Sequence, residues 1–176
     1  MGRFAGSGEG PRKARGARSL RGRQSFLRPD IEPLWQAWCD GSALPNPGKI
    51  GIGVVLVAPD GTRKENSSLT GAHGCNNEAE LHALCAALEL AAAAGVCRLR
   101  LHSDSDVALR YARVPAATRI ERLSLLALRA GELLRPFVDV ELVWIPRHRN
   151  AEADRLSRLA LGLPAVVALK AGRRRR

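Results

Sequence analysis

Hydrophobic and polar positions in the first part of the chain follow the pattern of β-strands. Residues 34–40 predict a strand that ends at a turn rich in glycine, proline and asparagine. Residues 50–58 are apolar nearly throughout, which is typical of a central strand buried on both faces. After a Pro-Asp-Gly turn, residues 62–70 predict a third strand, so the three strands form an antiparallel meander.

The next segment changes to the period of a helix. Its apolar residues recur at intervals of three, four and seven positions, at Leu81, Leu84, Cys85 and Leu88. We therefore expect a helix over residues 76–94, with Gly95 at its end and Cys85 in the core.

The remaining elements alternate between strands and helices. Strands are expected at 98–103 and 138–145, and helices at 105–113, 118–134 and 150–161. In the last strand one face, which we expect to be buried, carries Val138, Val140, Leu142 and Trp144. The order βββ-α-β-α-α-β-α predicts an α/β fold with a five-stranded mixed sheet and helices on both faces. The first and fourth strands should be parallel neighbours, with Asp40 and Asp104 at their carboxyl ends, where open α/β sheets place their sites.

Charge divides the chain into a neutral middle and two basic ends. Residues 1–30 have eight basic and two acidic side chains, residues 170–176 have five basic ones, and residues 31–169 have 15 of each sign. We expect a disordered basic tail over 1–30, a folded domain over 31–163 and a basic tail over 164–176. Basic tails bind polyanions without reading their sequence, so nucleic acid is the expected partner. Alternatively, the tails only aid solubility, or residues 1–30 follow from a misassigned start codon.

The cysteines and the apolar segments bear on location. Cys39, Cys75, Cys85 and Cys97 form no C-x-x-C pair, so a zinc site is not expected. The N-terminus has no apolar core of a signal peptide, although its arginine content also suits a transit peptide. No stretch reaches the roughly 20 apolar residues of a membrane span. We expect a cytoplasmic protein with free thiols and no membrane attachment.

Four acids stand in distinctive settings: Asp40 in WCDGS, Glu80 in NNEAEL, Asp104 in HSDS and Asp154 in NAEAD. Carboxylates that cluster repel one another and lose solvation, and hard cations compensate for this. Mg²⁺ is the usual cation in phosphate chemistry, so these acids suggest a metal-dependent enzyme acting on a phosphodiester.

Each residue also has a purely structural explanation. Asp40 and Asp104 could simply open turns, and Glu80 could be a helix-boundary acid with a partly solvated carboxylate. Asp154 falls in the first turn of the last helix, where an acid offsets the helix dipole. Asn150 could be the N-cap of that helix.

The segments that carry these acids resemble the type 1 ribonuclease H family. The matching motifs, in the family's order over about residues 34–163, are DGSALPNPG from Asp40, NNEAEL from Asn76, SDS at Ser103–Ser105 and WIPRHRNAEADRL from Trp144. The resemblance implies a ribonuclease H-like fold and an endonuclease that hydrolyses the RNA strand of RNA/DNA hybrids, leaving a 5′-phosphate and a 3′-hydroxyl.

The resemblance also implies roles for individual residues. Two Mg²⁺ or Mn²⁺ ions would be held by Asp40, which bridges them, and by Glu80, Asp104 and Asp154. The hybrid would be bound by Gly41, Ser42, Asn46, Asn76, Asn77 and Asn150. The expected partner is an RNA/DNA hybrid, and we expect a monomer.

The chain departs from the family pattern in several places. The segment from His148 to Asp154 is short, so His148 is either the catalytic histidine of the family or a surface residue. Cys75 and His73 stand where relatives grip a DNA phosphate. The basic handle of some relatives is absent, because only residues 114–117 separate the two helices. Asp106 occupies a position that is usually neutral, and the sequence gives no account of it.

Two rival functions remain compatible with the fold. The first is a non-catalytic protein that binds hybrids or double-stranded RNA, but binding alone needs no clustered carboxylates. The second is another nuclease of the same superfold, such as a Holliday-junction nuclease or a 3′–5′ exonuclease. The segments around Asn46 and Asn76 argue against that second rival.

Overall fold

The computed structural model describes residues 32–164, and the basic tails expected at both ends lie almost wholly outside this range. The strands are β1 (Leu34–Leu44), β2 (Gly48–Val57), β3 (Arg63–Gly74), β4 (Arg98–Ser103) and β5 (Asp139–Trp144). The helices are α1 (Asn76–Ala93), α2 (Asp106–Arg113), α3 (Glu121–Leu134) and α4 (Ala151–Ala160), with 3₁₀ turns η1 (Pro115–Ala117) and η2 (Arg147–Arg149). None of the helices in this range has the length and apolar character needed to cross a membrane.

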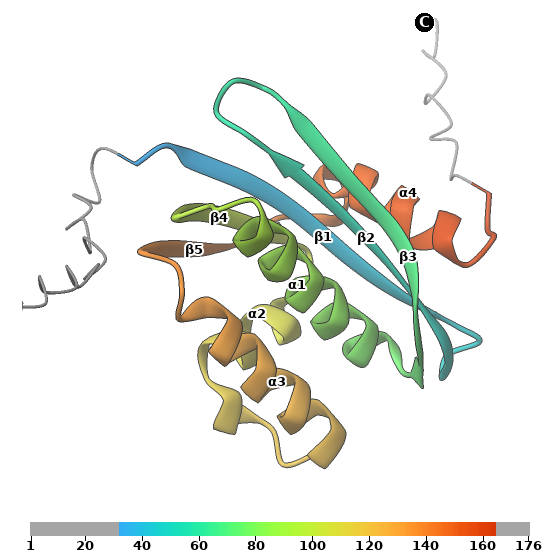
Figure 1. Ribbon diagram of the computed structural model, residues 1–176. Coiled ribbons are helices and arrows are strands. Elements are labelled where there is room, and N and C mark those ends of the chain that lie inside the picture. Colours follow the sequence, from blue (N-terminus) through green and yellow to red (C-terminus); the bar gives the residue numbers. More distant parts are fainter. Residues whose placement is uncertain (1–31, 165–176) are drawn as a thin grey trace, which may run out of the picture.

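The strands form one mixed sheet in the order β3-β2-β1-β4-β5. The β1–β2 and β2–β3 pairs are antiparallel, whereas β1–β4 and β4–β5 are parallel. Helix α1 covers one face, with α2 and α3 beside it, and α4 lies on the opposite face (Figure 1). The mixed sheet, the meander and the parallel pairing of the first and fourth strands were all predicted correctly.

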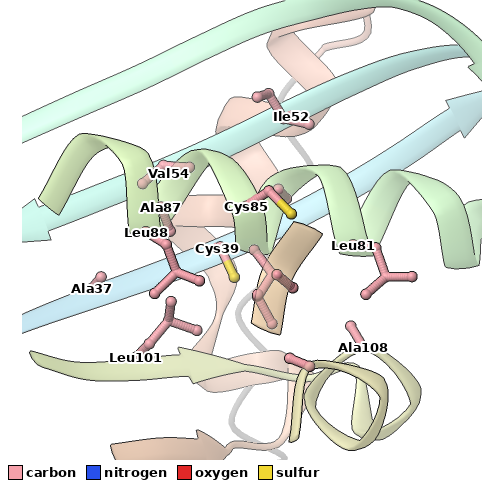
Figure 2. Close-up of a cluster of buried hydrophobic side chains, with 14 of the residues drawn as sticks. Ala37, Cys39, Ile52, Val54, Leu81, Cys85, Ala87, Leu88, Leu101 and Ala108 are labelled. Carbon is pink, nitrogen blue, oxygen red and sulfur yellow. The ribbon is translucent and has the colours of Figure 1, made fainter. Parts of the chain in front are cut away.

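The main core lies between α1 and the centre of the sheet. Figure 2 shows Leu88 of α1 opposite Leu101 of β4 and Leu81 of α1 near Ala108 of α2, and Cys39 and Cys85 belong to the same buried cluster. Strand β2 is buried along nearly its whole length because α1 packs on one of its faces and α4 on the other. The helical spacing of the α1 leucines and the unbroken apolar run of β2 thus have the meaning expected from the sequence.

Two glycines of β2 allow α4 to lie directly against the sheet. A Cβ atom on Gly53 would be 2.2 Å from the carbonyl oxygen of Ala153, and one on Gly51 would be 2.5 Å from that of Ser157. Any side chain at either position would therefore push the helix away from the strand. This close contact brings the acidic first turns of α4 next to β1.

The structure corrects two expectations about the strands. β1 does not end at Asp40 but continues to Leu44, since its pairing with β2 extends to Leu44 opposite Lys49. Only its pairing with β4 stops earlier, at Trp38 opposite His102, so Asp40 lies where β1 loses one neighbour. On the face that was expected to be buried, Val138 is 46% and Trp144 56% exposed, because they lie just before the edge strand β5 and at its end.

Candidate active site

Three carboxylates from separate elements meet where the pairing of the inner strands β1 and β4 ends. Asp40 belongs to β1, Glu80 to α1 and Asp104 follows β4, and one oxygen of each lies within 4.8 Å of the others. The contact between β1 and α1 depends on Gly41, where a Cβ atom would lie 2.0 Å from the carbonyl oxygen of Ala79. The structure thus brings together three of the four predicted acids.

Burial disfavours the charged forms of this carboxylate cluster. Asp40 is 3% exposed, and its burial raises its pKa to about 6. The charges of Asp104 and Asp154 also raise this pKa, whereas the hydrogen bond from Ser157 lowers it. Burial, together with the charges of Asp40 and Asp104, raises the pKa of Glu80 to about 9. Oε2 of Glu80 is buried without a hydrogen-bond partner among residues 32–164. An unpartnered oxygen beside two further carboxylates fits a cation ligand.

The fourth acid, Asp154, lies at the border of the cluster. It sits on α4 with a side chain that is 13% exposed, and its Oδ1 lies 2.5 Å from a guanidinium nitrogen of Arg147. Its charge still contributes to the raised pKa of Asp40. Asp154 is therefore close enough to act on the cluster, while its carboxylate is paired with an arginine.

Arg147 is a residue of the site that the sequence reasoning did not single out. It belongs to η2, and its hydrogen bond to Asp154 and the charges of Asp154, Asp40 and Asp104 raise its pKa. Its guanidinium therefore supplies positive charge at the rim of the carboxylate cluster. The only available signal in the sequence was a basic residue in the short loop before α4.

Asn150 is buried beneath the cluster. Its side chain is 1% exposed, and Nδ2 donates to the Cys39 carbonyl oxygen at 2.9 Å and to Oδ1 of Asp104 at 2.6 Å. Asn150 does precede the first residue of α4, but its side chain makes no capping hydrogen bond. Its amide instead joins β1 to the carboxylate of Asp104.

The asparagines predicted to bind substrate lie around the β1–β2 turn. Oδ1 of Asn46 accepts from the backbone N–H of Asn76 at 3.1 Å, and Oδ1 of Asn76 accepts from the N–H of Ala43 at 3.0 Å. These bonds fix the turn to the start of α1. Asn46, Asn76 and Asn77 are all exposed. The two hydrogen bonds therefore leave the amide nitrogens of Asn46 and Asn76 and the whole side chain of Asn77 accessible.

Two further serines contact the acids or lie next to them. Ser42, which was predicted to bind substrate, is half-buried on β1, and its Oγ lies 3.1 Å from Oγ of Ser157. Ser157, which the sequence reasoning missed, is fully buried on α4 and donates to Oδ2 of Asp40.

His148 lies apart from the carboxylate cluster. It is exposed in η2, between Arg147 and Arg149, and makes no side-chain hydrogen bond or ion pair within the described residues. It lies on the same 3₁₀ turn as Arg147 and is not among the residues of the three-carboxylate cluster.

The carboxylate of Glu78 binds the backbone at the start of α1. The backbone N–H of Cys75 donates to Oε2 of Glu78 at 2.8 Å, and the same oxygen lies 3.1 Å from Nε of Arg122. Glu78 and Arg122 line a hollow of about 320 Å³ together with His73, Pro47, Gly48 and Gly74. An internal carboxylate thus binds the amide at Cys75, in the region where we expected an altered phosphate contact.

Asp106 has a structural explanation. It occupies the first turn of α2, whose N-cap Ser105 accepts a hydrogen bond from the N–H of Ala108 at 3.2 Å. An acid at this position offsets the positive end of the helix dipole.

Comparisons with known proteins agree with this arrangement. The sequence profile of the Reverse transcriptase-like family matches residues 38–160. A Ribonuclease HI of Halobacterium salinarum is 36% identical over 78% of this chain and 69% of its own length. The Bifunctional protein Rv2228c of Mycobacterium tuberculosis is 31% identical over 73% of this chain, but the match spans only 36% of that protein.

Solved structures have the same fold. RNase H1 from Halobacterium salinarum superimposes with a TM-score of 0.69, covering 73% of this chain and 98% of that one. LC11-RNase H1 in complex with an RNA/DNA hybrid is 29% identical, with a TM-score of 0.65, covering 73% of this chain and 96% of that one. With the profile match, these similarities show that the chain belongs to the type 1 ribonuclease H family.

Proposed function

We propose that this ribonuclease is an endonuclease that cleaves the RNA strand of RNA/DNA hybrids and leaves a 5′-phosphate and a 3′-hydroxyl. The observation that carries the proposal is the group of three carboxylates whose oxygens lie within 4.8 Å of one another, together with the buried, unpartnered Oε2 of Glu80. A binding protein would gain nothing from such a cluster, because it repels the phosphates of a nucleic acid. The related LC11-RNase H1, whose structure contains a hybrid, supports the choice of substrate.

Asp40, Glu80, Asp104 and Asp154 would hold two Mg²⁺ or Mn²⁺ ions, with Asp40 as the shared ligand. When bound, such ions activate a water molecule and stabilise the leaving 3′ oxygen. The protein's own groups prepare the site: Asn150 holds Asp104 in place, and Ser157 orients Asp40. Arg147 neutralises Asp154 at the rim.

The hybrid would lie over the β1–β2 turn and the start of α1. The side-chain oxygens of Asn46 and Asn76 accept from the backbone N–H groups of Asn76 and Ala43, which leaves both amide nitrogens available for the substrate. Asn77, Ser42 and the backbone of Gly41 complete the proposed surface. In this role Asn150 acts through Asp104, since its own side chain is buried.

His148 would serve as a mobile proton carrier at the entrance. An exposed histidine on a short turn beside Arg147 can approach a substrate phosphate, and an imidazole can both donate and accept a proton. We also propose a cytoplasmic location, which the free state of all four cysteines supports. The monomeric state stays a prediction.

The test is digestion of one labelled sequence as RNA/DNA, RNA/RNA and DNA/DNA duplexes, with and without Mg²⁺ or Mn²⁺. We expect internal cuts only in the RNA of the hybrid and only with metal. Binding of the hybrid without any cleavage would favour the non-catalytic alternative. Equal cleavage of RNA/RNA would remove the assigned role of the asparagines in hybrid recognition.

A further inference from the structure

A buried hydroxyl group connects Asp40 to Ser42. Ser157 of α4 is fully buried, and its Oγ contacts three oxygens: Oδ2 of Asp40, the Asp154 carbonyl at 3.0 Å and Oγ of Ser42 at 3.1 Å. This contact depends on the close packing of α4 on β2, where a Cβ atom on Gly53 would lie 2.5 Å from the Ser157 nitrogen. The position of Ser157 is therefore fixed by the backbone on both sides.

The number of protons determines the direction of these hydrogen bonds. A serine hydroxyl has one proton to donate, whereas an ionised carboxylate and a carbonyl can only accept. The Asp154 carbonyl already lies within α4, where helical N–H groups satisfy it. The charged Asp40 oxygen is the stronger acceptor, so the Ser157 proton points to Oδ2 of Asp40. The hydrogen bond between the two serines must then be donated by Ser42.

This direction has a consequence for the half-buried Ser42. Its only proton is directed inward to Ser157, so the outer side of its oxygen carries lone pairs alone. A group that meets Ser42 from the substrate side must therefore be a donor. Ribose has such a donor in its 2′-hydroxyl, and deoxyribose does not.

We propose that Ser157 is a positioning residue that makes Ser42 an obligatory acceptor, so that Ser42 selects a sugar whose 2′ substituent can donate a hydrogen bond. The proposal rests on the proposed function, in which Ser42 faces the hybrid. It assigns a role in substrate choice to a buried side chain that does not touch the substrate. Ser157 acts only through Ser42 and Asp40.

The test compares two modified sugars in the presence of two alanine variants. A series of hybrids carries, at one RNA nucleotide each, either 2′-fluoro, which can only accept, or 2′-deoxy, which can do neither. The dissociation constant of each hybrid is measured without divalent cation for wild type, for Ser157→Ala and for Ser67→Ala. Ser67→Ala is the matched control, because Ser67 Oγ also contacts α4, at the Leu156 carbonyl (2.7 Å), but does not touch Asp40 or Ser42.

In wild type, 2′-fluoro should bind more weakly than 2′-deoxy at the nucleotide next to Ser42, because two acceptors face each other. Ser157→Ala frees the Ser42 proton, so the ratio of the two dissociation constants should shift by about 3- to 10-fold in favour of 2′-fluoro. Ser67→Ala should leave the ratio at its wild-type value. The effect of fluorine on sugar conformation is the same in each protein and cancels in this comparison.

An unchanged ratio in Ser157→Ala at every nucleotide would overturn the inference, even if the wild type cleaves hybrids as proposed. A similar shift in Ser67→Ala would also overturn it, since the effect would then come from displacement of α4. Failure of the wild type to cleave any hybrid would instead count against the proposed function. Alanine is favoured in helices, so Ser157→Ala should fold, and its melting temperature verifies this.

Discussion

The Arg147 guanidinium lies 2.5 Å from Oδ1 of Asp154, so the one predicted metal ligand outside the three-carboxylate cluster carries a cation from its own chain. The charge of Arg147 also lowers the raised pKa values of Asp40 and Glu80. Arginine remains protonated at any relevant pH, so this positive charge is permanent. It partly neutralises the carboxylate cluster and would compete with a metal ion for Asp154.

Replacing Arg147 should therefore change how the protein responds to metal. In Arg147→Gln the acids lose their internal cation, so the metal-free protein should be less stable by about 1 kcal/mol or less, since the arginine is largely exposed. The rise in melting temperature on adding Mn²⁺ should be larger than in wild type. Arg149→Gln, in the same turn and without an ion pair in the described range, is the control and should behave as wild type.

Asp40→Asn should abolish hybrid cleavage and keep the fold. The change preserves the shape of the side chain but removes the shared charge, and the loss of one like charge should leave the metal-free protein at least as stable. The measurement is cleavage in Mg²⁺ together with thermal unfolding. Asp106→Asn, an exposed acid in the first turn of α2, should retain activity. Near wild-type cleavage by Asp40→Asn would refute the assignment of Asp40.

The metal-free protein should lose stability as pH rises. The pKa of Glu80 is about 9 in the folded protein, against an ordinary value of 4.5, so the folded state holds its proton more tightly than the unfolded state. Its contribution is fully present below about pH 4.5 and is lost as pH rises towards 9. Melting temperatures across this range should fall for wild type and fall less for Glu80→Gln. Divalent cation should reverse the fall, because it stabilises the ionised form.

Two asparagines should separate a structural role from a substrate role. Asn150→Ala leaves the Cys39 carbonyl and the Asp104 carboxylate without their buried donor, which should cost about 1–3 kcal/mol of stability and reduce cleavage. Asn77→Ala changes an exposed side chain, so it should leave stability unchanged and raise KM for the hybrid. Thermal unfolding and steady-state kinetics of both variants distinguish the two roles, and a reversed pattern would contradict them.

Removing the basic tails should weaken substrate attraction without altering the chemistry. The tails carry the whole net charge of +11, because residues 31–169 are neutral. Deletion of residues 1–29 and 171–176 should raise KM and flatten its salt dependence, by about 0.9 in the log–log slope for each lost phosphate contact. The value of kcat should hold. A collapse of kcat at constant KM would show that the tails support the fold or the site.

Sequence periodicity predicted the fold because it reflects which faces are buried. The run of α1 leucines and the apolar β2 segment each had one reasonable interpretation, and the meander and the parallel pairing of the first and fourth strands followed from the order of the elements. The proximity of Asp40, Glu80 and Asp104 could be predicted because the positions of these residues along their strands and helix determine where they lie.

The remaining features of the site depend on side-chain packing that no local pattern records. The link from Ser157 to Asp40 arises from glycines 51 and 53 of β2, which are distant in sequence. The inward amide of Asn150 and the pairing of Arg147 with Asp154 depend on the path of the short loop before α4. The sequence predicts a strand end at Asp40 because it does not show that β1 continues along β2 after its pairing with β4 has ended.

Because β1 extends beyond its pairing with β4, the β1–β2 hairpin fixes the distance between Asp40 and the turn at Asn46. Asp40 and the turn at Asn46 belong to one continuous ribbon, and the strand from Asp40 to Leu44 spans roughly 13 Å at about 3.3 Å per residue. The distance between the turn proposed to hold the hybrid and the carboxylate cluster is therefore set by the covalent length of β1 and by its hydrogen bonds to β2. One residue inserted between Asp40 and Ser42 would turn Ser42 to the opposite face of the sheet. Two inserted residues would keep its direction and lengthen this segment by about 7 Å.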